Sequence, residues 1–156
     1  GKVEISSSIL AEHDFDPLPT YREPVESPVS TPEVAERFRL VLTTGGRSKA
    51  YTHSQFRRLP ELRKLMPEPV VQISSEDATA RRVRTGDRVV IESRRGSIEV
   101  EADVTDRVQP GVVHVYHGWA EANVNELTDH RALDPISGYP SFKSALCEIR
   151  PAATAT

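Results

Sequence analysis

Six short apolar segments between residues 38 and 149 constrain the fold more than any other feature of the chain. Each is only five to eight residues long, and most are rich in β-branched residues, which is typical of strands rather than helices. The segments are FRLVLT (38–43), PVVQI (69–73), RVVIES (88–93), SIEVEADV (97–104), GVVHVYH (111–117) and ALCEI (145–149). In the fourth, apolar and polar residues alternate strictly, so one face would meet a core and the other would meet water. The sequence therefore predicts a mainly β chain.

Helical signals are few and short. Ser74 can cap a helix of about two turns, because its hydroxyl suits the free amides of a first turn. A second helical stretch is expected to begin near Ser54 and to restart at Pro60, since proline suits the first turn of a helix. The turn 93–96 (SRRG) predicts a tight hairpin in which Gly96 takes a positive backbone angle. Many strands with a few short helices favour a closed barrel, because closure removes exposed strand edges.

The first 36 residues differ from the rest of the chain. They carry eight acidic residues, two basic residues and five prolines, a composition that favours an extended strap over a packed element. Phe15, Leu18 and Tyr21 are the apolar residues by which this strap could dock. We expect an extended, acidic, Pro-rich lead-in or linker at 1–36, a barrel domain at 37–151 and a tail at 152–156.

Positive charge is concentrated in one stretch of a chain whose net charge is −3. From Arg37 to Met66 there are eight Lys or Arg residues and a single acid, so a local anion is the expected partner. A Thr-Thr-Gly-Gly-Arg turn lies in this stretch. Its glycines let the backbone approach a ligand, and Arg47 can grip a phosphate through two parallel donors. Taken alone, the same residues could also form a plain turn with solvated charges.

Cys147 is the only cysteine, which excludes an internal disulfide and a cysteine-ligated iron–sulfur cluster carried by this chain alone. In its apolar strand it is expected to be a small buried hydrophobic residue. His114 and His117 would point to opposite faces of a strand, so we expect no metal site. No apolar run approaches the roughly 20 residues of a membrane span, and the start, GKVEISSSIL, lacks the basic and apolar regions of a signal peptide.

Four motifs follow one another along the chain: TTGGR at 43–47, HGW at 117–119, NVNELTD at 123–129 and DPISG at 134–138. Together they resemble the C-terminal molybdopterin-dinucleotide-binding domain of the molybdenum and tungsten oxidoreductases related to dimethyl sulfoxide reductase and formate dehydrogenase. The resemblance covers residues 38–150 without a large gap. It implies a double-psi β-barrel of the aspartate-decarboxylase-like type.

The resemblance also implies which residues would contact the cofactor. The first contact loop would be Thr44, Gly45, Gly46, Arg47 and Ser48, completed by His53 and Ser54 at a helix start, where free amides favour anions. His117 and Asn125 would make polar contacts with the pterin or its phosphate, because an asparagine offers both donors and an acceptor. Asn123 could replace Asn125, and Lys143 would lie close to the cofactor. Without the resemblance, Trp119 would most simply be a core residue and DPISG a pair of turns.

The implied cofactor is molybdopterin guanine dinucleotide, present in the full enzyme as the bis form with molybdenum or tungsten. The metal ligand and the iron–sulfur cluster would come from elsewhere, so this chain would orient a cofactor without being catalytic alone. Its partners would be the remaining domains or the catalytic subunit of a parent oxidoreductase, with no nucleic acid and no direct membrane insertion.

Two other classes of function stay open at the level of the sequence. A double-psi barrel without a cofactor could be a protein-interaction module, like the substrate-recruiting domain of some ATPases, although that class gives no reason for the combined motifs. Sixteen arginines would suit a nucleic-acid-binding module, although the remainder of the chain is acidic.

Overall fold

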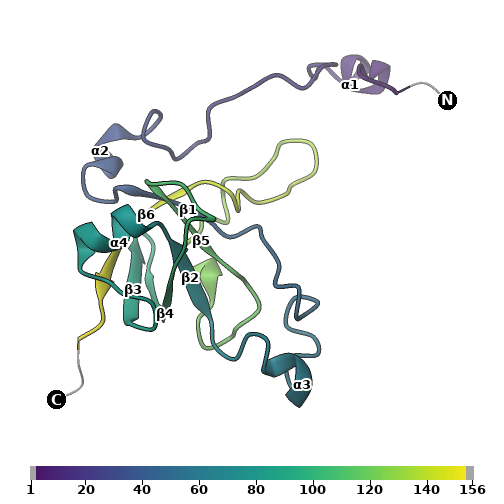
Figure 1. The fold of residues 1–156 in the computed structure, drawn as a ribbon. Coiled ribbons are helices and arrows are strands. Elements are labelled where there is room, and N and C mark those ends of the chain that lie inside the picture. The colour runs from purple at the N-terminus through teal and green to yellow at the C-terminus, as the bar shows by residue number, and fades with distance from the viewer. Residues whose placement is uncertain (1–2, 154–156) are drawn as a thin grey trace.

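The six apolar segments form six strands that close into a barrel (Figure 1). The computed structural model describes residues 3–153. Around the barrel the strands follow the order β1-β5-β2-β4-β3-β6. They are β1 (Leu40–Thr43), β2 (Val70–Ile73), β3 (Arg88–Ser93), β4 (Ser97–Val104), β5 (Val112–Val115) and β6 (Ala145–Pro151). The predicted mainly β chain with a closed barrel is confirmed, and the double-psi arrangement of its strands stays a prediction.

The pairing of the strands decides where the loops meet. β1 pairs in parallel with β5 and β2 with β4, whereas the other neighbours are antiparallel. Because β1 runs parallel to β5 and antiparallel to β6, the ends of β1 and β5 and the start of β6 lie at one edge of the barrel. The loops attached to these three strand ends therefore converge.

The barrel is filled by the apolar faces of its strands. β4 alternates as predicted, with Ile98 and Val100 buried and Glu99 exposed between them. Leu42 on β1 has no exposed surface. Cys147 on β6 is also fully buried, and this burial raises the pKa of its thiol above the ordinary range. The expectation that Cys147 packs as a small hydrophobic residue is confirmed.

The remaining regular structure consists of short helices. α4 (Ser75–Arg81) is the predicted capped helix: the Ser74 hydroxyl accepts a hydrogen bond from the amide of Asp77 at 3.1 Å. Arg82 ends this helix in the left-handed conformation, with φ of 56°. The remaining elements are α1 (Ser8–Glu12), α2 (Pro32–Ala35), α3 (Pro60–Arg63), which begins at the predicted proline, and the 3-10 helix η1 (Val124–Glu126).

Two local predictions are wrong. No helix begins near Ser54, because His53 and Phe56 adopt φ values of 56° and 69°, which a right-handed helix does not contain. Gly96 does close the β3–β4 turn, but it does not adopt a positive φ. A Cβ at this position would lie 2.9 Å from the carbonyl oxygen of Glu126, so glycine is needed for close packing of the hairpin against η1.

The lead-in crosses from α1, which projects away from the barrel in Figure 1, to α2. Phe15, Leu18 and Tyr21, by which the lead-in could dock, are 36%, 46% and 83% exposed, so none of the three is buried. The first two residues of the lead-in, and residues 154–156 of the predicted tail, lie outside the described residues. Within residues 3–153, no helix has the length and apolar character needed to cross a membrane.

Leu42→Ala should lower the free energy of unfolding by about 2–5 kcal/mol, because it removes a fully buried side chain from the strand that closes the barrel. Leu65→Ala is the matched control, since Leu65 is 70% exposed and its loss should cost no more than about 0.5 kcal/mol. Chemical denaturation of both variants gives the comparison. Equal losses would contradict the assignment of Leu42 to the core.

Candidate functional site

A cavity of about 1250 Å³ lies where the three loops converge. It is lined by residues from the loop after β1, the loop after β5 and the loop before β6, and by residues 22–25 of the lead-in. Eight of the ten residues expected to contact a cofactor line this cavity, and the other two, Gly46 and Ser48, do not. Asn123, the alternative to Asn125, lines it as well. The structure thus brings together residues up to 99 positions apart in sequence, Thr44 and Lys143 being the extremes of the predicted set.

Gly46 and Ser48 belong to the loop after β1 but do not line the cavity. A Cβ on Gly46 would lie 2.5 Å from the His114 ring, so only glycine leaves room for this imidazole. The buried Ser48 hydroxyl accepts a hydrogen bond from the amide of Ala50 at 3.1 Å. On the cavity side, a Cβ on Gly45 would lie 3.3 Å from the Lys143 side chain. The glycine pair therefore allows side chains to approach the backbone from both directions.

Backbone contacts connect the loop after β1 to the loop before β6. The amide and the hydroxyl of Thr44 both donate to the carbonyl oxygen of Phe142, at 2.8 and 3.0 Å. Thr44 is only 2% exposed, so this contact is shielded from water. It fixes Gly45 and Lys143, the neighbours of these two residues, at the same side of the cavity.

Two histidines form a short hydrogen-bonded chain along the cavity. His117 Nδ1 lies 3.2 Å from the carbonyl oxygen of Thr44, and His117 Nε2 lies 3.0 Å from His53 Nδ1. A carbonyl oxygen only accepts, so His117 carries its proton on Nδ1; when that ring is neutral its Nε2 accepts, and His53 donates from Nδ1. Burial lowers the pKa of the nearby His114, and a hydrogen bond with Thr43 partly opposes this effect.

Gly118 permits the loops that carry these histidines to touch. Its φ is 120°, a conformation that L side chains rarely adopt, and a Cβ there would lie 2.7 Å from the carbonyl oxygen of His53. No side chain separates the two backbones at this point. Gly118 therefore sets the distance between the loop after β1 and the loop after β5.

Trp119 both packs in the core and lines the cavity. It meets Tyr51 edge to face at 5.8 Å between ring centroids, and the Arg57 guanidinium lies 5.7 Å above its ring. Arg57 also pairs with Glu121 at 2.9 Å. These contacts join the basic stretch to the loop after β5, which sequence reasoning had not connected.

The basic and acidic side chains around the cavity differ in whether they already have partners within the protein. In the part of the chain that the structure describes, no hydrogen bond or ion pair holds the charged ends of Arg22, Arg47 and Lys143. The two acids of the lining are already engaged. Asp134 Oδ1 accepts from the amide and hydroxyl of Ser137 at 2.7 and 2.8 Å, and Glu23 accepts from nearby hydroxyls. Three unpaired cations therefore face one cavity, an arrangement suited to an anionic ligand.

A buried ion network holds the lead-in to the barrel. Glu26 is 5% exposed, and its carboxylate accepts two bonds from Arg95, at 3.1 and 2.7 Å, and one from the amide of Leu146 at 2.7 Å. Arg94 adds a contact at 3.3 Å. Arg95 also donates to Asp129 at 3.1 Å. We call these residues the Glu26 network, and it connects the lead-in, the β3–β4 turn, the loop after η1 and β6.

Sequence reasoning missed the Glu26 network and the contribution of residues 22–25. Glu26 and Arg95 are 69 positions apart, and both lie in charged stretches that resemble solvated surface. Only the position of this acid between two prolines, Pro24 and Pro28, could have drawn attention to Glu26. Among residues 3–153, no group of three or more His, Cys, Asp or Glu side chains is placed to hold a metal ion.

Comparisons with known proteins agree on one family. The family model for the molydopterin dinucleotide binding domain matches residues 40–146. The dopamine dehydroxylase of Eggerthella lenta is 35% identical over 164 aligned positions, which cover 95% of this chain and 16% of that protein. The F420-dependent formate dehydrogenase subunit alpha of Methanocaldococcus jannaschii is 35% identical over 128 positions, covering 79% of this chain and 19% of that protein.

A solved structure agrees with the fold. Acetylene hydratase from Pelobacter acetylenicus superposes with a TM-score of 0.84 over 95% of this chain and 23% of that chain, at 23% sequence identity. At this identity the similarity concerns the fold alone. The chain spans less than a fifth of the curated relatives named above.

Gly118→Ala should lower the free energy of unfolding by about 3 kcal/mol, because the cost of a left-handed conformation, about 1–2 kcal/mol, adds to overpacking against His53. Gly86→Ala is the matched control: its φ is 90° but its Cβ would meet nothing within 4 Å, so only the conformational cost applies. Thermal unfolding of both variants gives the difference. A loss no greater than that of the control would show that the two loops do not depend on this contact.

The Glu26 network should make stability sensitive to acid. The amide of Arg131 and the guanidinium of Arg95 lower the pKa of Asp129 from 3.8 to about 2. A lowered folded-state pKa stabilises the fold above the ordinary value, so this contribution should be fully present above pH 3.8 and lost as pH falls toward 2. Denaturant unfolding across this range should show a shallower pH dependence for Asp129→Asn than for the wild-type chain. Parallel curves would contradict a role for Asp129.

Proposed function

This chain belongs to the molydopterin dinucleotide binding domain family, and from that premise we propose that its cavity holds the guanine dinucleotide form of molybdopterin as part of a larger molybdenum or tungsten oxidoreductase. Membership in this family gives the class of cofactor. What we propose in addition is that the base is guanine, which residues contact the cofactor, and that the chain is part of a larger enzyme. The observation that carries this proposal is that three cations around one cavity, Arg22, Arg47 and Lys143, have no hydrogen-bond or ion-pair partner among residues 3–153.

The residues of the cavity fit such a group in size and charge. A volume of about 1250 Å³ exceeds the roughly 300–1,000 Å³ of ordinary small-molecule pockets, as an elongated dinucleotide requires. A diphosphate carries negative charge that Arg47 and Lys143 can neutralise, with the guanidinium binding two oxygens at once. The engaged acids, Glu23 and Asp134, do not compete for these cations.

Different parts of the lining would hold different parts of the ligand. We assign the diphosphate to the loop after β1, where Gly45 and Arg47 combine backbone amides with a guanidinium. Thr44 supports this loop from beside the ligand, because its own amide and hydroxyl are engaged by Phe142.

We assign polar contacts with the pterin to Asn125, because its side chain offers both donors and an acceptor. His117, the other predicted contact, lines the cavity with both ring nitrogens already engaged by Thr44 and His53. In the neutral His53–His117 pair, the fixed proton on His117 Nδ1 leaves one free ring nitrogen, on His53, to face a ligand.

The cofactor, when bound, supplies the redox chemistry, and this chain binds and orients it. The relatives carry names as different as dopamine dehydroxylase, acetylene hydratase and periplasmic nitrate reductase. Each is matched over only 13–16% of its length, so we propose that the reaction and its substrate are set by other domains of the parent enzyme. Those domains are the proposed partners of this chain.

The family match supports cofactor binding over a protein-interaction barrel without a cofactor. The geometry supports the same choice. A flat protein-binding face would have no need of a deep cavity in which unpaired cations from several loops converge.

Arg47→Ala should weaken the binding of GDP, which represents the nucleotide half of the cofactor, by about 10- to 100-fold, because one charge-assisted phosphate contact contributes about 1.5–3 kcal/mol. Titration of the 156-residue chain, followed by backbone amide resonances, measures the affinity and locates the shifts. The barrel should stay folded, because Arg47 is an exposed loop residue.

Arg63→Ala is the control for this experiment. It removes the same charge from the basic stretch, but Arg63 lies on α3 outside the cavity lining. GDP affinity should be unchanged in this variant. Equal weakening in both variants would indicate a diffuse charge effect and would contradict the assignment of Arg47.

A further inference from the structure

We propose that residues 22–25 of the lead-in are a built part of the cofactor site, in which Arg22 supplies a further guanidinium to the diphosphate and Glu26 is the residue that positions it. This inference rests on the proposed function and extends it to a segment that the family match, at residues 40–146, does not include. It concerns one ligand chemistry, an organic diphosphate.

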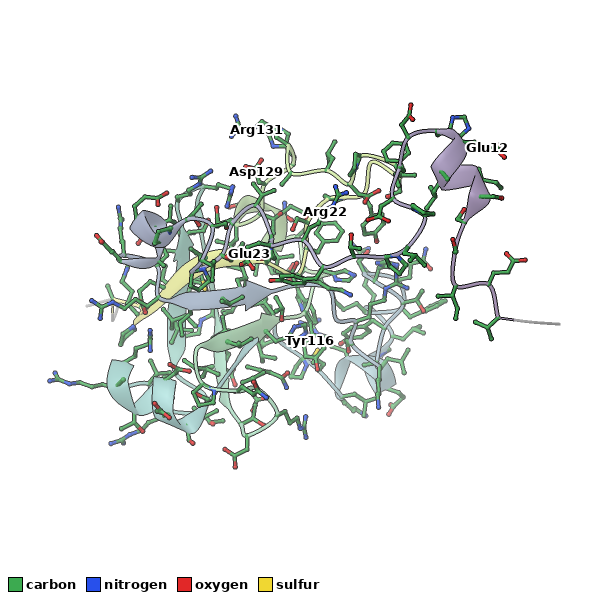
Figure 2. All side chains as sticks on the ribbon, turned by 90° about the horizontal axis from the view of Figure 1, so that it is seen from above. Glu12, Arg22, Glu23, Tyr116, Asp129 and Arg131 are labelled. Carbon is green, nitrogen blue, oxygen red and sulfur yellow. The ribbon has the colours of Figure 1, made fainter. Side chains whose placement is uncertain are left out.

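The segment borders the cavity along its whole length. Arg22, Glu23, Pro24 and Val25 are consecutive lining residues. Val25 also borders a second, much smaller cavity of about 20 Å³, together with Glu26 and Arg95. The segment therefore separates the large cavity from the Glu26 network. Figure 2 shows the lead-in passing from Glu12 on α1 to Arg22 and Glu23 over the barrel.

Local hydrogen bonds give the segment a defined conformation. Glu23 accepts from the hydroxyls of Tyr21 and Ser27, and the Ser27 hydroxyl in turn accepts from the amides of Val29 and Ser30 at 3.1 and 3.0 Å. These bonds hold the pKa of Glu23 below its ordinary range, the Ser27 hydroxyl having the larger effect. The carboxylate of Glu23 thus has its hydrogen-bond partners within its own segment. The neighbouring guanidinium of Arg22 is not needed to balance its charge.

The Glu26 network fixes the segment to the barrel at one point. The carboxylate of Glu26 binds Arg95 in two places and also accepts from the amide of Leu146 on β6. The Ser144 hydroxyl donates to the backbone oxygen of Glu26 as well. Because β6 begins at the edge where the cavity lies, this attachment places the residues that precede Glu26 at the cavity mouth.

Within the described residues, the guanidinium of Arg22 makes no hydrogen bond or ion pair. Its charge contributes only weakly to lowering the pKa of Asp16. That carboxylate already accepts bonds from the Thr20 hydroxyl at 2.8 Å and the Leu18 amide at 3.1 Å. An arginine held at a cavity mouth by a buried anchor, and left without a counter-ion, is suited to bind one from a ligand. Arg22 would thus complement Arg47, which lies 25 positions later in the chain.

The test compares diphosphate binding by variants of the 156-residue chain, using GDP and inorganic pyrophosphate as probes. Arg22→Gln should weaken both probes about tenfold, whereas Arg22→Lys should retain part of the affinity because it keeps the charge. Arg63→Gln, outside the cavity lining, should leave both affinities unchanged. Unchanged binding in Arg22→Gln overturns the role of Arg22.

The role of Glu26 is tested by a double-mutant cycle. Glu26→Gln should weaken pyrophosphate binding, and combining it with Arg22→Gln should weaken binding no further, because Glu26 acts through Arg22. Additive losses would overturn the positioning role. Thermal unfolding identifies a Glu26 variant that fails to fold, in which case Arg95→Lys, which keeps the charge but breaks the paired geometry, takes its place in the cycle.

The outcomes separate this inference from the proposed function. If Arg47→Ala weakens both probes while Arg22→Gln weakens neither, the proposed function stands and the present inference fails. If the wild-type chain binds neither probe at millimolar concentration, the proposed function fails and this inference fails with it.

Discussion

Closure of the barrel by β1 is the constraint on which the remaining structure depends. This strand of four residues pairs with β5 on one side and β6 on the other, and its direction relative to each decides which loops share an edge. Thr44, His117 and Lys143 come together because strand ends meet there, and not because local sequence directs them to a ligand. The hydrogen bonds between Thr44 and Phe142 then connect the loops after the strands have placed them.

The charged side chains of this chain occur in two kinds of environment, a buried ion network and the lining of a cavity. In the Glu26 network, charges are buried and paired, so their mutual attraction offsets the cost of removing them from water, and loss of one partner would leave the other uncompensated. Around the cavity, Arg22, Arg47 and Lys143 are unpaired, whereas the acids are satisfied by their own turns. The first arrangement stabilises the wall of the site, and the second leaves binding capacity for a ligand.

The strands and eight of the residues that line the cavity could be predicted from the sequence, whereas the rest of the lining, the geometry around His53 and the role of the lead-in could not. Alternation in segments such as 97–104 reports directly on burial, since a strand has a period of two residues. The helix expected near Ser54 failed because His53 and Phe56 adopt left-handed conformations, which a bulky residue such as phenylalanine rarely takes and does not signal in the sequence. Glu26 was missed because its partners are brought near only by the completed barrel.

The contact between Gly118 and the carbonyl of His53 joins two loops at residues 65 positions apart in the chain. Where two backbones touch without an intervening side chain, neither loop can shift unless the other follows. The loop after β1 and the loop after β5 are therefore expected to move as one unit. A change in the length of one of these loops would require a matching change in the other.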